Sequence, residues 1–222
     1  MNIENEREIK QEGERYFILN KPYNMVSQFI SSHKVNLLTD LPFPFPEGTH
    51  AIGRLDSNSE GLLILTTNKK VTRLLFEAEV AHVRKYLVQV EKQMTNEALD
   101  KLRTGVTIRV KGGGDYITTP CKAELVEKPE NLFAGGYNTS QYKTYSWLLL
   151  SLTEGKFRQV RKMVAAVKHP CRRLMRVAIE DLTLGDLAPG DVKEIEEEVF
   201  FRLLKIPWQK DEPDVETTNN NR

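Results

Sequence analysis

Cysteine is scarce in this sequence of 222 residues, and long apolar runs and a net charge of either sign are missing. The two cysteines, Cys121 and Cys171, lie fifty residues apart, so a disulfide-stapled miniprotein is excluded and we expect packed thiols rather than a bridge. His169 lies two residues before Cys171, but no second closely spaced Cys or His pair exists to complete a tetrahedral zinc site. We therefore expect no metal.

The longest apolar runs, Leu62–Leu65 and Trp147–Leu150, are the size of a strand and far short of the ~18 residues that a membrane-spanning helix needs. The N-terminus lacks the basic start and apolar core of a secretory signal. These absences predict a cytoplasmic protein. A composition of 40% hydrophobic and 28% charged residues excludes wholesale disorder, and the length suffices for one sizeable core or two small lobes sharing a sheet.

The formal net charge of +1 conceals a segregation along the chain. The stretch from Gly155 to Ile179 contains no Asp or Glu, whereas acidic residues dominate after it. Its cations are Lys156, Arg158, Arg161, Lys162, Lys168, Arg172, Arg173 and Arg176. This region is expected to face an anion, although an ordinary solvated surface and a nucleic-acid interface are both compatible with the pattern.

Local patterns predict strands at Tyr16–Leu19, Ala51–Leu55, Leu62–Thr66, Lys85–Glu91, Thr107–Val110, Cys121–Glu127, Thr144–Leu152 and Leu174–Ile179. They predict helices at Val71–Ala78, Asn96–Arg103, Lys156–Lys168 and Val199–Leu204. Many strands joined by short turns, without regular strand–helix alternation, indicate an α+β fold with a mostly antiparallel sheet.

The chain divides into three parts by composition. Residues 1–14 read as a loose lead-in, 15–206 as the folded domain, and 207–222 as a polar acidic tail that is expected to be disordered. Within the folded part, the proline-rich segment Leu41–Pro46 is expected to be an exposed connector, and Ala188–Asp191 a turn.

The predicted helix Lys156–Lys168 carries most of the basic stretch. Apolar residues recur in it at helical spacing, at Phe157, Val160, Met163, Val164 and Val167, and are expected to form its buried stripe. Three cations then share the opposite side, Arg158, Arg161 and Lys162, where they suit phosphate contacts or an ion pair with a buried carboxylate.

One carboxylate is placed in an unusually well-defined position. The segment Gly53-Arg54-Leu55-Asp56 ends a predicted strand, and a short polar turn connects it to the buried run Leu62–Leu65. Rigid strands on both sides would fix Asp56 better than an ordinary loop does. Asp before Ser-Asn-Ser is also a common turn former, so spacing alone leaves a catalytic and a structural role open.

These residues also resemble a known family. Gly53–Asp56 with Ser59–Asn68 after it is similar to the signature of the pseudouridine synthases related to the ribosomal small-subunit enzyme. Three more blocks agree in order and spacing, Asn20–Pro22, Lys85–Val88 and Glu154–Met163. Within the family, the sequence most resembles members that act on the large ribosomal subunit.

The resemblance covers Tyr16–Ile195 and implies the pseudouridine synthase fold, with two sub-lobes around a central cleft. The residues before Tyr16 are too few and too acidic for the S4 RNA-binding domain that many relatives carry. The implied reaction isomerises a specific uridine of ribosomal RNA without a cofactor, and we expect a monomer that binds no membrane.

The resemblance also implies roles for individual residues. Asp56 acts on the ribose, either by attacking C1′ or by removing the 2′ proton, and the sequence does not choose between these routes. Arg161 holds the Asp56 carboxylate through two hydrogen bonds, and Tyr86 stacks on the target base and assists proton loss from C5. The cations expected to contact RNA are Arg54, Lys85, Arg158, Lys162, Arg172, Arg173 and Arg176.

Two other classes of function stay open from the sequence. A non-catalytic RNA-binding protein would use the same basic face without isomerising uridine. A retaining glycosidase would need a carboxylate pair, for which Asp56 and Glu60 are the candidates, but the chain has only 2 Trp and no aromatic-rich platform for a sugar.

Overall fold

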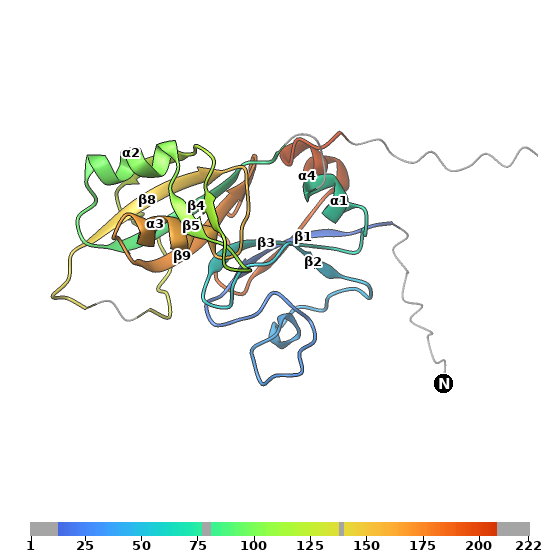
Figure 1. Ribbon diagram of the computed structural model, residues 1–222. Helices are drawn as coiled ribbons and strands as arrows, with labels where there is room; N and C mark the ends of the chain where they lie inside the picture. The colour runs from blue at the N-terminus through green and yellow to red at the C-terminus, as the bar shows by residue number, and fades with distance from the viewer. Residues whose placement is uncertain (1–12, 77–80, 138–139, 208–222) are drawn as a thin grey trace, which may run out of the picture.

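The computed structural model describes residues 13–76, 81–137 and 140–207 (Figure 1). Its main sheet contains nine strands: β1 (Tyr16–Lys21), β2 (His50–Ile52), β3 (Glu60–Thr66), β4 (Arg84–Glu91), β7 (Lys122–Val126), β8 (Tyr145–Leu152), β9 (Cys171–Ile179), β10 (Leu182–Thr183) and β11 (Val192–Ile195). Two more strands, β5 (Thr107–Arg109) and β6 (Asp115–Ile117), form a separate hairpin. The helices are α1 (Val71–Phe76), α2 (Asn96–Thr104), α3 (Gln159–Ala166) and α4 (Glu197–Leu203), with a 3-10 turn η1 at Leu38–Asp40.

The main sheet has the strand order β11-β1-β3-β9-β4-β8-β7, with β2 paired to β3 and β10 paired to β9. All of these pairs are antiparallel except β3 with β9, which pair in parallel over Glu60–Gly61 and Met175–Arg176. This arrangement confirms the predicted α+β class with a mostly antiparallel sheet. The parallel contact lies at the centre of the sheet, where the two halves of the molecule meet.

The apolar core forms three clusters on the faces of this sheet. One cluster lies between β4, β8, α2 and α3 and contains Val88, Leu148 and Met163. A second packs α1 and α4 against the sheet through Tyr16, Leu75 and Phe200, and a third buries the other face of β1 and β3. In Figure 1, α2 and α3 accordingly cover one half of the sheet, and α1 and α4 the other.

The predicted connector Leu41–Pro46 contains neither helix nor strand, but it is not simply exposed. The rings of Phe43 and Phe45 pack edge-on against Phe17, with centroid distances of 5.6 and 6.3 Å. The prolines set the path of the segment, while its two aromatic rings seal the edge of the third core cluster.

The eight predicted strands and four predicted helices are present, with shifted ends. The strand predicted at Ala51–Leu55 stops at Ile52, because Gly53 adopts a φ of +69° and turns the chain out of the sheet. The short strands β6, β10 and β11 were not predicted, since none shows a clear apolar alternation. Of the predicted lead-in the structure describes only Gly13 and Glu14, and of the predicted tail only Pro207. Residues 77–78 of the first predicted helix also lie outside the described residues.

The basic helix is shorter than predicted. Arg158 has a φ of +55°, in the left-handed region, so α3 begins only at Gln159. Val160, Met163 and Val164 are buried as expected, but Phe157 precedes the helix and is 62% exposed. The prediction of Phe157 as a core residue is therefore wrong, and Arg158 does not share a helical face with Arg161 and Lys162.

Candidate active site

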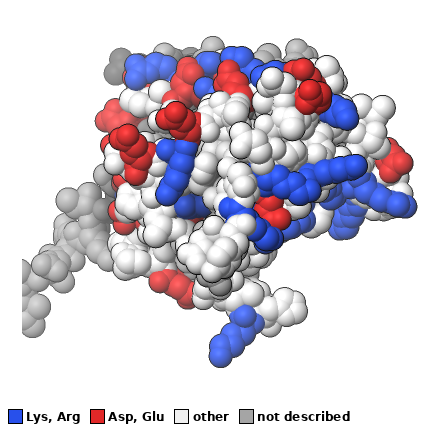
Figure 2. All heavy atoms as spheres, turned by 90° about the vertical axis from the view of Figure 1, so that its left-hand side faces the viewer, with Lys and Arg blue, Asp and Glu red and all other residues white. Residues whose placement is uncertain are grey.

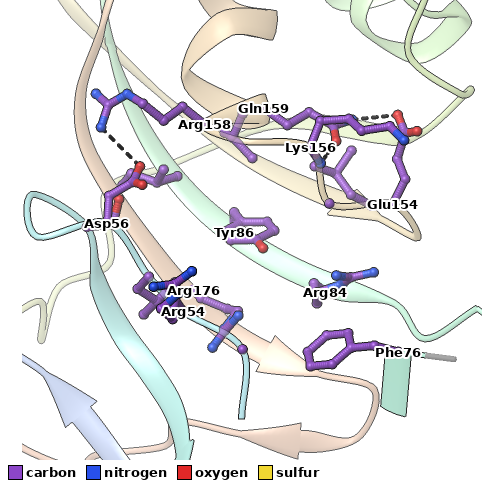
Figure 3. A pocket seen from close by; sticks show the side chains of 17 residues that line it. Arg54, Asp56, Phe76, Arg84, Tyr86, Glu154, Lys156, Arg158, Gln159 and Arg176 are labelled. Carbon is purple, nitrogen blue, oxygen red and sulfur yellow. Dashed lines mark hydrogen bonds and ion pairs between the residues drawn. The ribbon is translucent and has the colours of Figure 1, made fainter. Parts of the chain in front are cut away.

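A pocket of about 330 Å³ opens beside the parallel contact between β3 and β9. Its walls come from the loop between β2 and β3, from β4 and β9, and from the segment 152–160 that leads into α3. In Figure 3, Tyr86 lies near the middle of the pocket, with the segment 154–159 on one side and Arg54, Arg84 and Arg176 on the other. The pocket thus joins both halves of the sheet.

Asp56 lies on a loop that Ser27 holds through two hydrogen bonds to Leu55. The Ser27 hydroxyl donates to the carbonyl of Leu55 at 3.1 Å, and the Leu55 amide donates to the same hydroxyl at 3.0 Å. A tight turn closes after Asp56, where the Ser59 amide donates to the Asp56 carbonyl at 2.9 Å. These contacts fix the backbone of the loop that carries the carboxylate. The expected strand on its N-terminal side does not reach Asp56, because β2 ends at Ile52.

Two arginines reach the Asp56 carboxylate. Arg158 Nη1 lies 3.1 Å from Asp56 Oδ2, and Arg161 Nε lies 3.9 Å from the same oxygen. Arg161 does not form the two hydrogen bonds to Asp56 that we expected. Instead its Nη2 donates to the Asn58 carbonyl and, at 3.2 Å, to the Ser59 hydroxyl, so this arginine holds the loop that carries the carboxylate. Arg158, which sequence reasoning assigned to phosphate contact, is the closer cation.

Lys21 lies directly beneath this loop and is completely buried. Its ammonium donates to the carbonyls of Pro22 and Met25 at 2.8 and 2.7 Å and reaches the carbonyl of Ser57 at 3.5 Å. Burial lowers the pKa of Lys21 to about 8, although the nearby carboxylates of Glu60 and Asp56 act in the opposite direction. Sequence reasoning included Lys21 only in a motif and missed this supporting position.

Glu154 fixes the other wall of the pocket. It accepts hydrogen bonds from the Tyr116 hydroxyl, the Thr119 amide and the Gln159 side chain. Burial acts to raise the pKa of Glu154, but these hydrogen bonds outweigh it and lower the pKa. Because Gln159 is the first residue of α3, this network sets where the helix starts.

The predicted RNA-contacting cations divide into exposed and buried groups. Arg54 and Arg172 are exposed, and Lys85, Arg158 and Lys162 are partly exposed. Arg173 and Arg176, with 6% and 4% exposure, are buried. A phosphate on the surface of the protein cannot reach a buried guanidinium, so these two arginines do not offer surface contacts in this structure.

Arg173 has a clear structural partner. Its Nε and Nη2 bond to the two carboxylate oxygens of Glu60 at 2.7 and 3.1 Å, and Glu60 is 3% exposed. This pair also removes the basis for the glycosidase alternative, because both oxygens of Glu60 are engaged away from the pocket that Asp56 lines. Sequence reasoning missed the pair because its members are 113 residues apart.

Lysine and arginine side chains nevertheless gather on the molecular face that carries α2 and α3. Figure 2 shows them over one part of this face, with acidic side chains mostly over another part. The exposed Lys156 and the partly exposed Arg84 line the pocket as well. Sequence reasoning did not single out Arg84, although it directly precedes Lys85 and Tyr86.

Both cysteines are free thiols. Burial raises the pKa of Cys171 to about 11, with Arg161 and Arg158 acting in the opposite direction, so this thiol stays protonated at neutral pH. Among the described residues, no cluster of His, Cys, Asp and Glu suits a metal ion. No helix in the described part of the chain is long and apolar enough to cross a membrane.

Comparisons with known proteins agree on one relationship. Residues 15–166 match the family described as RNA pseudouridylate synthase. The chain is 34% identical over 199 residues to ribosomal large subunit pseudouridine synthase E of Vibrio parahaemolyticus, covering 86% of this chain and 78% of the relative. It is 39% identical over 174 residues to the protein of the same name from Xanthomonas axonopodis, covering 78% and 89%.

A solved structure described as a pseudouridylate synthase superimposes on this fold. It has a TM-score of 0.69 and 23% sequence identity, and the superposition covers 86% of this chain and 74% of the other. Beyond the family match at 15–166, the strands β9, β10 and β11 complete the same sheet.

Proposed function

This chain belongs to the RNA pseudouridylate synthase family, and from that premise we propose that it converts a specific uridine of large-subunit ribosomal RNA to pseudouridine, with Asp56 as the reacting carboxylate. The substrate follows from the relatives, which are large-subunit enzymes by name. The observation that supports the site most strongly is the position of Asp56, fixed at the wall of the pocket, paired with Arg158 and close to Arg161.

The proposed reaction is an isomerisation. The bond between N1 of uracil and C1′ of ribose breaks, the uracil turns, and C5 bonds to the same C1′, after which C5 loses its proton and N1 gains one. Atoms and electrons balance within the nucleotide, so the proposal includes no cofactor. Asp56 either attacks C1′ or removes the 2′ proton, and both roles need an ionised carboxylate. Arg158 and Arg161 place two positive charges beside that carboxylate.

Tyr86 is proposed to stack against the target uracil. It lines the pocket from β4 and is only partly buried, which leaves a ring face for the base. The volume of about 330 Å³ lies near the lower end of the range for small-molecule sites and is suited to one flipped nucleoside. Flipping costs about a few kcal/mol, which contacts to the flanking phosphates must offset.

The cations proposed for those phosphate contacts are exposed or partly exposed. Arg54 and Lys156 line the pocket, and Lys85, Lys162 and Arg172 lie outside it. Asp56, Tyr86 and Arg161 all come from one chain, which supports a monomer as the active unit. We further propose that residues 15–206 form the catalytic domain, since β1 and β11 pair within one sheet, and that the protein acts in the cytoplasm, where its substrate would be assembled.

The experiment compares ribosomal RNA from cells with and without this protein by carbodiimide treatment and primer extension, which marks each pseudouridine. One stop in large-subunit RNA should disappear in cells that lack the protein and return with the wild-type gene. If every stop persists in cells that lack the protein, the proposed function is contradicted.

Replacement of Asp56 by Asn tests the assignment of the carboxylate. The amide keeps the shape of the side chain but has no nucleophilic or basic oxygen, so Asp56→Asn should abolish tritium release from 5-tritiated uridine while RNA affinity changes by only a few-fold. A non-catalytic RNA-binding protein would instead bind RNA with both side chains and release tritium with neither. Turnover by Asp56→Asn near the wild-type rate would remove Asp56 from the reaction.

A further inference from the structure

Arg176 is a buried cation whose burial the fold does not explain. Its side chain lies within β9 at 4% exposure, and no ion pair joins it to a carboxylate among the described residues. Its Nε donates to the Leu62 carbonyl on β3 at 2.8 Å. Its Nη2 is buried and finds no acceptor in the described part of the chain. A buried charge with an unused donor is costly, which points to a role in the pocket that it lines.

Arg173 provides the contrast on the same strand. It is as buried as Arg176, but the two oxygens of Glu60 neutralise it in a bidentate pair. Arg176 has no such carboxylate. The same strand therefore holds one arginine that is fully used by the fold and one that keeps a donor free beside the pocket.

Tyr86 is the neighbour of Arg176 across the sheet. The register of β4 and β9 pairs these two residues directly, next to an irregularity between Lys85 and Tyr86. Paired residues on adjacent strands project to the same face, with Cβ atoms about 5 Å apart, and both line the pocket. Burial lowers the pKa of Arg176, and the phenol of Tyr86 acts in the opposite direction while Arg84 adds to the lowering.

We propose that Arg176 is a positioning residue for Tyr86: bridging from β3 to β4 beneath the pocket, it directs the phenol oxygen toward the target base and stabilises that oxygen as a phenolate. This inference rests on the proposed function and assigns one of its steps. After C5 has bonded to C1′, the C5–H bond breaks, its electron pair restores the C5–C6 double bond, and the proton passes to the phenolate of Tyr86. The phenol then returns the proton to water.

The test follows the step in which C5 loses its proton. RNA with deuterium at C5 of the target uridine is compared with ordinary RNA for the wild type, Arg176→Met and Arg176→Lys. Arg176→Met should lower kcat by about 100-fold with little change in KM, and its kcat should show a larger deuterium effect than the wild type, because proton loss becomes rate-limiting. Arg176→Lys should restore part of kcat, since an ammonium keeps the charge.

Two further variants separate this role from a general loss of structure. Arg202→Met removes an exposed cation of α4 and should leave kcat and the isotope effect unchanged. Tyr86→Phe and the double variant with Arg176→Met should lose the same activity, because Arg176 acts through the hydroxyl. An unchanged isotope effect in a folded Arg176→Met protein, or additive losses in the double variant, would overturn the proposal. If Arg176→Met does not fold, the same criteria apply to Arg176→Gln, whose amide removes the charge but keeps a hydrogen-bond donor for the Leu62 carbonyl.

A measurement without substrate keeps this inference separate from the proposed function. Carbon-13 signals of the tyrosine rings, with Tyr86 identified by Tyr86→Phe, are compared in the wild type and in the Arg176 variants. The Tyr86 signal should move in Arg176→Met and move less in Arg176→Lys, because Tyr86 and Arg176 are paired across β4 and β9. An unchanged Tyr86 signal in Arg176→Met would overturn the role of Arg176 even in an active enzyme, whereas a moved signal in a protein that makes no pseudouridine would contradict only the proposed function.

Discussion

The two arginines near Asp56 differ in how deeply their side chains are buried. Arg158 is closer to the carboxylate but has a side chain that is 35% exposed, whereas Arg161 is farther away and only 10% exposed. Exposed ion pairs contribute little because water screens them. Arg161 also bonds to the backbone of Asn58 and to Ser59, and so controls the position of the loop as well as its charge.

Replacement of these two arginines should therefore have unequal effects. Arg161→Met should lower kcat by about 100-fold or more, as expected when a preorganised charge in a site is removed, while Arg158→Met should lower it only a few-fold. Single-turnover rates on a ribosomal RNA fragment measure both. Equal losses would show that the shorter distance of Arg158 matters more than the burial of Arg161.

The burial of Lys21 should make the stability of the protein depend on pH. Its pKa is about 8 in the folded protein against 10.5 for an ordinary lysine. Between these values the unfolded chain binds a proton that the folded protein does not, so the free energy of unfolding rises with pH. The gain should amount to at most a few kcal/mol.

Urea denaturation at several pH values between 7 and 11 measures this gain, with Lys21→Met for comparison. The wild type should gain stability relative to Lys21→Met as pH rises from about 8 to about 10.5. Lys193→Met, at an exposed site on β11, should follow the wild type. Parallel curves for the wild type and Lys21→Met would contradict a lowered lysine pKa.

The sequence singled out Asp56 from its local pattern, a short polar turn before a buried strand, but the contacts that hold its loop come from distant residues: Ser27 bonds to Leu55, and Arg161 bonds to Asn58 and Ser59. The sequence did not distinguish the buried Arg173 and Arg176 from the exposed Arg172, because their environments depend on partners more than 110 residues away: Glu60 for Arg173 and Leu62 for Arg176. The run of cations in the sequence therefore predicted a basic surface, but only the exposed members of the run contribute to that surface.

Among the structural elements, the parallel contact of β3 with β9 determines the shape of the pocket. Gly61 has a φ of +98°, and a Cβ added there would lie 2.3 Å from the carbonyl oxygen of Arg176 and 2.8 Å from Met175 Cγ. Only glycine allows the two backbones to approach this closely. Gly61, the second residue of β3 after the Asp56 loop, thus also joins the two halves of the sheet.

Gly61→Ala should destabilise the protein through this contact, and Gly113→Ala is the matched control. Gly113 has a similar φ of +94°, but an added Cβ would meet nothing within 4 Å, so alanine there pays only the conformational cost of about 1–2 kcal/mol. Gly61→Ala should lower the free energy of unfolding by at least about 2 kcal/mol more. Equal values from urea denaturation would mean that the β3–β9 contact adjusts without cost.

Strands and helices were predictable where the core imposes a clear apolar period, as in β4 and α2. The start of α3 was not, because it depends on Arg158 in a left-handed conformation and on Gln159 bonded to Glu154. Helical periodicity extended the predicted helix to Lys156 and placed Phe157 in the core. Side-chain hydrogen bonds from a neighbouring segment overrode the local pattern.

At the scale of the whole molecule, a net charge of +1 is compatible with RNA binding because the charges are unevenly distributed. The cations beside the pocket can attract phosphates locally.

The sequence of the tail carries acidic residues at Asp211, Glu212, Asp214 and Glu216, so removing Asp211–Arg222 should leave RNA affinity unchanged or slightly raise it at low salt.

RNA affinity should depend on salt through the cations beside the pocket. Arg54 and Lys156 are both exposed and both line the pocket, whereas Lys193 and Arg202 are exposed on β11 and α4. Each lost phosphate contact lowers the slope of log affinity against log salt by about 0.7 to 0.9. Filter binding to a ribosomal RNA fragment should therefore give a smaller slope of log affinity against log salt for the double variant Arg54→Ala/Lys156→Ala. The control Lys193→Ala/Arg202→Ala removes the same charge and should leave this slope unchanged. A smaller slope for the second pair would show that the RNA lies over β11 and α4 rather than at the mouth of the pocket.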